Sequence, residues 1–199
     1  TDQQRADLRK GCGYSLDTMP FLDKWAQGGM DFERGYTPNP TCMPARVSMF
    51  TGRYSQSHQV RTNHNAADAR YTKDLLDVLK ENGYVTALCG KNHSHHSTED
   101  FDFCETCGHL GDEGEVNTTP EEIAFAEFLK GTLHMEMHEP SPGGVCVQHP
   151  FRNVSSALKF MDTVEKDRPF FAWVSFAEPH NPYQVPEPYF DMFPSESLP

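Results

Sequence analysis

The sequence predicts an α/β fold in which a mostly parallel sheet is flanked by helices. Segments with helical periodicity alternate with short apolar runs that are typical of buried strands. Apolar residues make up 37% of the chain and charged residues 23%, which is the balance of a folded domain and not of a disordered one. Because 199 residues can bury a sizeable core, we expect one compact domain.

The first half of the chain contains three expected helices and one expected strand. Residues 18–28 form the first helix, since a proline suits its first turn and two glycines end it. Residues 43–50 form a short second helix. The clearest helix covers 72–82, with a leucine stripe on one face and a glycine after its end. A buried strand over 84–89 follows.

The second half adds two helices and one strand. A proline and two glutamates favour the start of a helix over 119–130. Residues 153–166 form another helix, with Asn153 as its N-cap rather than as a glycosylation acceptor. Residues 169–176 form a strongly apolar strand. The stretch 104–150 is rich in Gly, His, Glu and Pro and is predicted to leave the sheet.

Two polar loops follow the predicted strands. Gly-Lys-Asn-His over 90–93 comes after the first strand, and Glu-Pro-His-Asn-Pro over 178–182 comes after the second. In α/β sheets, ligands bind beyond the carboxyl ends of the strands. We therefore expect both loops to lie at a functional site.

The net charge of −12 argues against a nucleic-acid partner or an anionic membrane surface, since both favour a basic face. An anionic substrate is compatible with this charge, because a pocket responds to its nearest charges. No run of about 18 apolar residues is present, so no transmembrane span is expected. The six cysteines do not suggest a dense disulfide framework. The compartment stays open, since periplasm, secretion and cytoplasm all agree with the sequence.

Cys42 stands at the start of the short helix over 43–50, four residues before Arg46. Residues i and i+4 share a helix face, so the guanidinium can lie beside position 42. The helix N-terminus adds a partial positive charge and open N–H groups, which favour an anion. This arrangement suits a nucleophile that attacks an anionic ester. The alternative is an ordinary small cysteine buried at a helix start.

Four segments of the chain, in the order 2–5, 42–46, 90–93 and 179–183, carry distinctive polar motifs. The segment 42–46 (Cys-Met-Pro-Ala-Arg), with Thr-Gly downstream, resembles the signature of the sulfatase family, which is part of the alkaline phosphatase superfamily. The segment 2–5 (Asp-Gln-Gln-Arg) resembles the family's opening metal-binding motif. The loop 90–93 resembles its Gly-Lys-x-His loop, and 179–183 (Pro-His-Asn-Pro-Tyr) resembles its Pro-His-x-Pro loop. One motif alone is a weak to moderate signal, but their shared order makes a strong one.

The resemblance implies a sulfuric ester hydrolase for carbohydrate or aryl sulfates, in which a maturation enzyme converts Cys42 to formylglycine. The hydrated aldehyde would attack sulfur from an oxygen bound to a divalent cation, and sulfate would leave by elimination. By the same resemblance, Arg46 would hold the formylglycine and Lys91 would contact the sulfate oxygens. His93 would act as a base during elimination, and His180 would contact the sulfate and protonate the leaving oxygen.

The implied metal ligands are Asp2, Gln3 and residue 42. Oxygen donors suit a hard cation, so Ca²⁺ is expected, with Mn²⁺ and Mg²⁺ as alternatives. Many family members carry a second aspartate where Gln3 stands, and the glutamine removes one negative charge. In the family, further metal ligands and another sulfate-binding lysine lie C-terminal to the position of Pro199. We therefore expect residues 1–199 to be the N-terminal part of a single catalytic domain, truncated at both ends and inactive alone.

Two other functions stay open. A phosphonate monoester or phosphodiester hydrolase of the same superfamily would use similar chemistry, and Gln3 is compatible with it. A non-catalytic zinc-binding module belongs to a different class. It would be built on a stretch of cysteines and histidines: Cys89, His93, His95, His96, Cys104, Cys107 and His109. A further, weaker candidate metal site has ligands at alternate positions, which would place them on one face of a strand: His134, Glu136 and His138.

Overall fold

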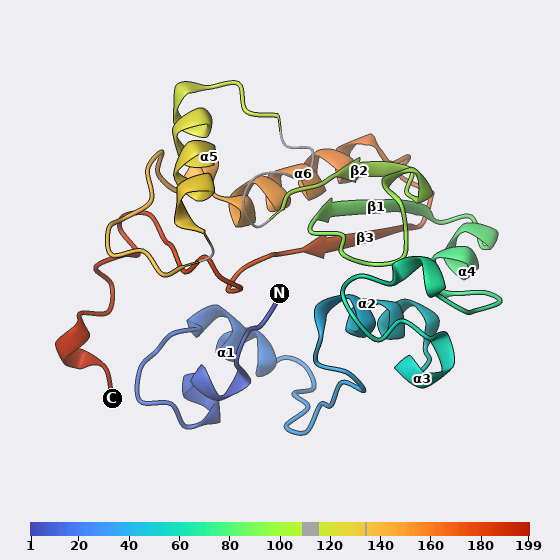
Figure 1. Ribbon diagram of the computed structural model, residues 1–199, viewed down its shortest axis with the longest axis horizontal. Helices are drawn as coiled ribbons and strands as arrows, with labels where there is room; N and C mark the ends of the chain where they lie inside the picture. The colour runs from blue at the N-terminus through green and yellow to red at the C-terminus, as the bar shows by residue number, and fades with distance from the viewer. Residues whose placement is uncertain (109–115, 134) are drawn as a thin grey trace.

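The computed structural model describes residues 1–108, 116–133 and 135–199. At its centre lies a three-stranded parallel sheet with strand order β2-β1-β3. The strands are β1 (Val85–Gly90), β2 (Phe103–Glu105) and β3 (Phe170–Ser175). Helices cover both faces of the sheet (Figure 1). The predicted α/β fold with a mostly parallel sheet is confirmed.

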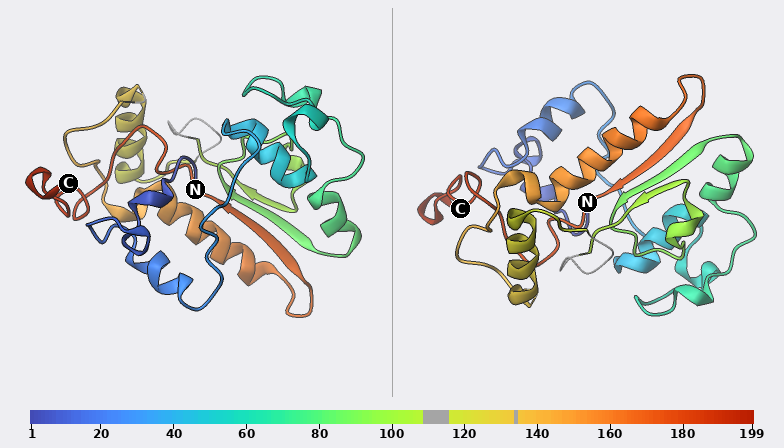
Figure 2. Two further views of the ribbon diagram at one scale, coloured as in Figure 1. Left: turned by 90° about the horizontal axis from the view of Figure 1, so that it is seen from below. Right: turned by 90° about the horizontal axis from the view of Figure 1, so that it is seen from above.

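One face of the sheet is covered by α6 (His149–Thr163), which runs along the strands (Figure 2). Ala157 and Phe160 of this helix form a core cluster with Ala87 and Cys89 of β1. Removing this apolar surface from water stabilises the pair at about 25 cal/mol per Å². This face therefore holds α6 and β1 together.

The opposite face is covered by α2 (Cys42–Thr51) and α4 (Leu75–Glu81). Phe50 of α2 and Leu76 of α4 form a second cluster with Leu88 of β1. Because β1 is covered on both faces, its residues from Thr86 to Gly90 are all buried, without the alternation of a strand that has one exposed face. The same packing fixes the start of α2, which carries Cys42, relative to the sheet.

The remaining helices are α1 (Pro20–Ala26), α3 (Ser55–His58) and α5 (Pro120–Thr132). In Figure 1, α1 and α5 lie on the side toward which β1 and β3 point. A capping box starts α5, with the Thr119 hydroxyl accepting from the Glu122 amide at 3.2 Å. Within the described residues, every helix is too short or too polar to cross a membrane.

Two details differ from the sequence prediction. The last helix begins at His149 and not after Asn153. Asn153 lies buried inside α6, where its side-chain amide donates to the Ser175 carbonyl at 3.4 Å. The predicted N-cap is therefore wrong, because a tertiary contact uses the side chain that would cap. The stretch predicted to leave the sheet also begins inside β2, a strand too short for any period to be visible in the sequence.

Candidate active site

The site lies where β1 and β3 end side by side. Gly90 pairs with Ser175, and the Lys91 amide donates to the Ser175 carbonyl at 2.8 Å. Gly90 has φ +109°, and a Cβ on it would lie 2.2 Å from that same carbonyl oxygen. Only glycine can stand there. The two predicted site loops therefore leave the sheet from one point.

The N-terminus of the chain lies near the ends of the strands in Figure 1, and Asp2 contacts Lys91 there. The buried Lys91 ammonium donates to Oδ2 of Asp2, and the Arg46 guanidinium is 3.6 Å from the same oxygen. Burial alone would raise the pKa of Asp2, but the hydrogen bond from Lys91 and the charges of Lys91 and Arg46 hold it below its usual value. Asp2 is therefore a carboxylate that organises two cations.

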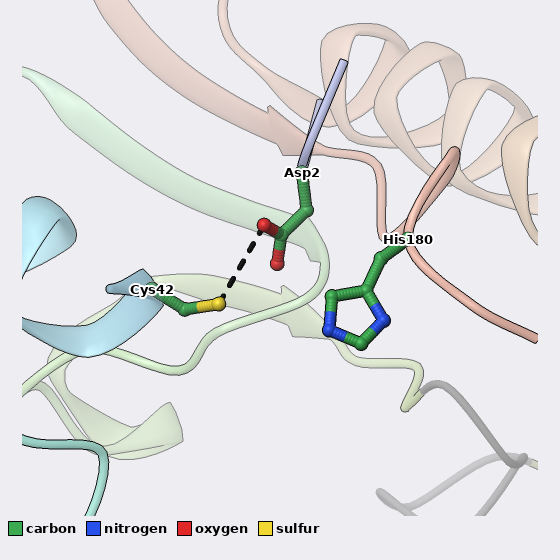
Figure 3. A group of neighbouring side chains, drawn as sticks. All are labelled: Asp2, Cys42 and His180. Carbon is green, nitrogen blue, oxygen red and sulfur yellow. Dashed lines mark hydrogen bonds between the residues drawn. The ribbon is translucent and has the colours of Figure 1, made fainter. Parts of the chain in front are cut away.

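Cys42 is the first residue of α2, and its Sγ donates to Asp2 Oδ1 at 3.6 Å (Figure 3). Burial, followed by the negative charge of Asp2, raises the pKa of this thiol above its usual value. The unmodified residue is therefore a thiol at neutral pH. Since the thiolate is the nucleophilic form, unmodified Cys42 is a poor nucleophile.

Arg46 follows Cys42 by one helical turn and is held by β3. Its Nη1 donates to Ser175 Oγ at 2.9 Å, and its guanidinium lies 5.5 Å from the centre of the Trp173 ring. These two contacts were not expected from the sequence. The signal that could have found one of them is Ser175, a polar residue at the end of an apolar strand.

His180 comes from the loop after β3, and Figure 3 shows its ring beside Asp2 and Cys42. Its Nδ1 lies 2.6 Å from the Asn181 carbonyl oxygen. A carbonyl oxygen only accepts, so Nδ1 carries a proton and the neutral ring has its lone pair on Nε2. One ligand atom each from Asp2, Cys42 and His180 lie within 4.8 Å of one another.

His93 is half-buried in the loop after β1, with φ +45°. Burial, followed by the positive charges of Lys91 and Arg46, lowers the pKa of its ring below 6.5. The imidazole is therefore neutral at pH 7 and able to accept a proton. The structure thus brings six of the seven predicted site residues together. The seventh, Gln3, has an exposed side chain and φ +61°.

The cysteines of the 89–109 stretch do not converge. Cys89 packs with α6 on one face of the sheet, while Cys104 packs on the opposite face beside Phe50. Cys107 Sγ donates to the side-chain Oδ1 of Asn153 at 3.3 Å. His109, from the predicted zinc-binding stretch, and His134, from the weaker metal set, lie outside the described residues.

The cluster of Asp2, Cys42 and His180 fits a divalent cation. Asp2 offers a charged oxygen, and the ammonium of Lys91 bound to it shows that positive charge is favourable there. His180 adds a nitrogen, and position 42 adds a third donor. An aldehyde hydrate at position 42 would present oxygen instead of sulfur, which matches the preference of hard cations such as Ca²⁺.

The sulfatase family model matches residues 1–198. The chain belongs to the sulfatase family. An arylsulfatase of Clostridium perfringens (strain 13 / Type A) is 28% identical to it, over all of this chain and 46% of that protein. Arylsulfatase K of Mus musculus is 24% identical over 87% of this chain and 29% of its own length. The chain thus spans less than half of these curated relatives.

Solved structures agree on the fold of this sulfatase-family chain. A phosphonate monoester hydrolase of Agrobacterium radiobacter superposes with a TM-score of 0.77 at 22% identity, covering all of this chain and 44% of that one. A protein solved with its substrate D-glucosamine-2-N,6-O-disulfate superposes with a TM-score of 0.63 at 18% identity, covering 90% of this chain and 33% of that one. Both structures therefore share the fold of this chain.

Proposed function

We propose that the enzyme containing this chain hydrolyses sulfate esters through a formylglycine made from Cys42. One observation carries the proposal. Lys91 and Arg46 converge on a point beside Cys42, as an anionic substrate requires, yet the raised pKa of that thiol makes it a poor nucleophile. Conversion of residue 42 to formylglycine would supply the nucleophile that the thiol does not. Residues 1–199 form the N-terminal part of a single catalytic domain.

Two groups that the family uses supply the missing chemistry. A hydrated formylglycine supplies an oxygen nucleophile with a second hydroxyl, and a divalent cation, with Ca²⁺ as first choice, neutralises charge. Asp2 and residue 42 would hold the cation, which leaves Nε2 of His180 for a proton. Gln3 contributes only if its exposed side chain turns inward. A formylglycine-generating enzyme is the required maturation partner.

The residues of this chain bind the ester and transfer the protons that the reaction requires. Lys91 and Arg46 bind the sulfate oxygens and offset their charge. Neutral His93 takes a proton from a hydroxyl of residue 42, which its lowered pKa permits at pH 7. His180 donates from Nε2 to the leaving oxygen in its protonated form, because its Nδ1 is already directed at the Asn181 carbonyl.

A cavity of ≈ 660 Å³ adjoins His180 and receives the alcohol part of the ester. Phe151, Tyr183 and Tyr189 are among its lining residues. Aromatic walls stack on aryl groups and on the apolar faces of sugars. This lining supports aryl or carbohydrate sulfates as substrates.

Mass spectrometry of the peptide that contains residue 42 tests the modification. Conversion to formylglycine exchanges sulfur for oxygen with loss of two hydrogens, so the mass falls. Ordinary oxidations of cysteine all raise it. A peptide from active enzyme that carries only unmodified cysteine would refute the proposal.

A phosphonate monoester or phosphodiester hydrolase is the second candidate. The fold shared with the Agrobacterium radiobacter hydrolase favours it, as does Gln3 at a position where many sulfatases carry aspartate. The two candidates are separated by kcat/KM of the full-length enzyme for an aryl sulfate and for the matching phenyl phosphonate. A higher value for the phosphonate would replace the first candidate by the second.

A further inference from the structure

A second group of potential metal ligands lies away from the residues assigned above. Asp74 is the N-cap of α4, and its Oδ1 accepts from the amides of Leu76 and Asp77 at 3.0 and 3.1 Å. This leaves Oδ2 for other partners. The Asp74 side chain is fully buried. A buried carboxylate needs compensating positive charge or donors.

Two neighbouring histidines of the loop after β1 meet this oxygen. Nε2 of His95 lies 2.9 Å from Asp74 Oδ2, and Nε2 of His96 lies 2.8 Å from it. Their side chains are 2% and 7% exposed, and their ring centres are 4.1 Å apart. One ligand atom from each of the three residues lies within 4.8 Å of the others.

Hydrogen bonds alone do not satisfy this cluster. His95 Nε2 makes a hydrogen bond to Asp74 Oδ2, but His96 Nε2 is not aligned for one. Among the described residues, neither His96 Nε2 nor His95 Nδ1 has a hydrogen-bond partner, although both atoms are buried. Such orphaned polar atoms are rare in folded proteins and call for an explanation.

The other side of His96 faces a carboxylate, at a distance slightly longer than a hydrogen bond. Its Nδ1 lies 3.6 Å from the Asp100 carboxylate. A histidine that binds metal through one nitrogen usually directs the other N–H at a carboxylate or carbonyl, which fixes the ring. A proton on Nδ1 leaves the lone pair of Nε2 directed toward the site.

We propose that Asp74, His95 and His96 bind a second divalent metal ion, of the zinc class. Two imidazoles and one carboxylate form a ligand set that zinc accepts, with water in the fourth position. Tetrahedral bonds of about 2.1 Å place ligand atoms about 3.4 Å apart. The two distances from Asp74 Oδ2 to the histidine nitrogens, 2.9 and 2.8 Å, need to lengthen by only about 0.5 Å to reach this value. Nitrogen donors favour zinc, cobalt and nickel over calcium, so this site and the first one select different metals.

The surroundings give this metal a structural role. Phe50 of α2 packs edge-on against His96, with ring centres 4.8 Å apart, and Tyr71 packs against His95 with the same distance between ring centres. The ion would tie α4 to the loop that carries Lys91 and His93. It would thereby fix the segment that supplies two residues of the active site.

Metal content measures the second site directly. The full-length enzyme with Asp2→Asn, which weakens the first site, is stripped with a chelator and dialysed against Zn²⁺. We expect this enzyme to bind one equivalent of Zn²⁺. Adding His96→Gln should remove the bound Zn²⁺, and adding the exposed His64→Gln should retain it. Co²⁺ in place of Zn²⁺ should give visible d–d bands that are lost with His96→Gln. Equal Zn²⁺ retention in all three proteins, or no bound Zn²⁺ in any, overturns the proposal.

Thermal unfolding keeps the test decisive if His96→Gln folds poorly. A ligand that binds only the native state raises its melting temperature. Zn²⁺ should therefore raise the Tm of the Asp2→Asn enzyme, whose second site is intact. A Tm that is unchanged by Zn²⁺ contradicts the proposal without reference to any histidine variant.

Discussion

At the scale of single residues, the chemistry of position 42 is decided by its neighbours. The carboxylate of Asp2 and the surrounding burial keep the Cys42 thiol protonated. The same carboxylate gathers Lys91 and Arg46. The site therefore favours a bound anion while it disfavours a thiolate. This combination distinguishes it from the site of a cysteine hydrolase, where nearby positive charge lowers the thiol pKa.

Cys42→Ala in the full-length enzyme should reduce sulfatase activity by several orders of magnitude, because no nucleophile remains. The free energy of unfolding should change by less than about 1 kcal/mol, since the half-buried side chain makes one weak hydrogen bond. Aryl sulfate turnover and denaturant unfolding measure the two effects. Residual activity near that of the unsubstituted enzyme would remove residue 42 from the mechanism.

If His93 acts as the proposed base, its lowered pKa should set the acid limit of activity and part of the stability profile. As pH falls below 6.5, the unfolded chain takes up a proton on this ring before the folded one does, so stability decreases with falling pH in that range. His93→Gln should flatten this slope and should remove the acid limb of kcat/KM. Unfolding curves and rate profiles between pH 5 and pH 8, taken on both proteins, check the sign. A slope that is the same in both would show that His93 does not titrate there.

At the scale of elements, the parallel pair β1 and β3 delivers the site. Ser175 ends β3 and holds the Arg46 guanidinium, while Gly90 ends β1 and permits the close approach of the two chains. The active-site loops then follow at once on both strands. Rigid strands position such loops more accurately than flexible connections would.

Ser175→Ala should lower kcat/KM about tenfold or more with little change in fold, because a hydrogen bond to a charged group contributes about 1.5–3 kcal/mol. Arg46 keeps its contact with Trp173 in this variant. The exposed Ser197→Ala provides a matched control. An unchanged kcat/KM would show that Ser175 does not position Arg46 for the reaction.

Gly90→Ala should destabilise the protein by about 1–3 kcal/mol or more, since its φ of +109° and the nearby Ser175 carbonyl both oppose a side chain. Gly131→Ala should instead stabilise it by about 0.5–1 kcal/mol. This second glycine lies in α5, and a Cβ there meets nothing within 4 Å. Denaturant unfolding of both variants compares them. Equal effects would contradict the assigned backbone geometry.

At the scale of the whole molecule, one ion pair joins segments far apart in the chain. Lys91 is 1% exposed and binds Asp2, which comes 89 residues earlier. Removing one partner of a buried pair leaves the other charge without full compensation, at a cost of about 3–5 kcal/mol. This pair therefore couples the start of the chain to the end of β1.

Lys91→Met should lower the free energy of unfolding by about 3–5 kcal/mol. The double variant Asp2→Asn with Lys91→Met should lose less than the sum of the two single variants, because no buried charge is left between them. A double-mutant cycle by urea unfolding measures this coupling. Strict additivity would mean that the two residues do not interact in solution.

The sequence by itself determined the elements with strong local signals and the motif residues of the site. The leucines of α4 and the mostly apolar residues of β1 predicted their structures, because hydrophobic patterning is a local property. Tertiary packing alone decided the role of Asn153, the strand β2, and the contact of Ser175 with Arg46. The cluster of Asp74 with two histidines is likewise invisible in the sequence, since Asp74 is separated from His95 by 21 residues and meets the histidines only when α4 packs beside the loop after β1. Contacts of this kind depend on the positions of whole elements, and no short segment encodes them.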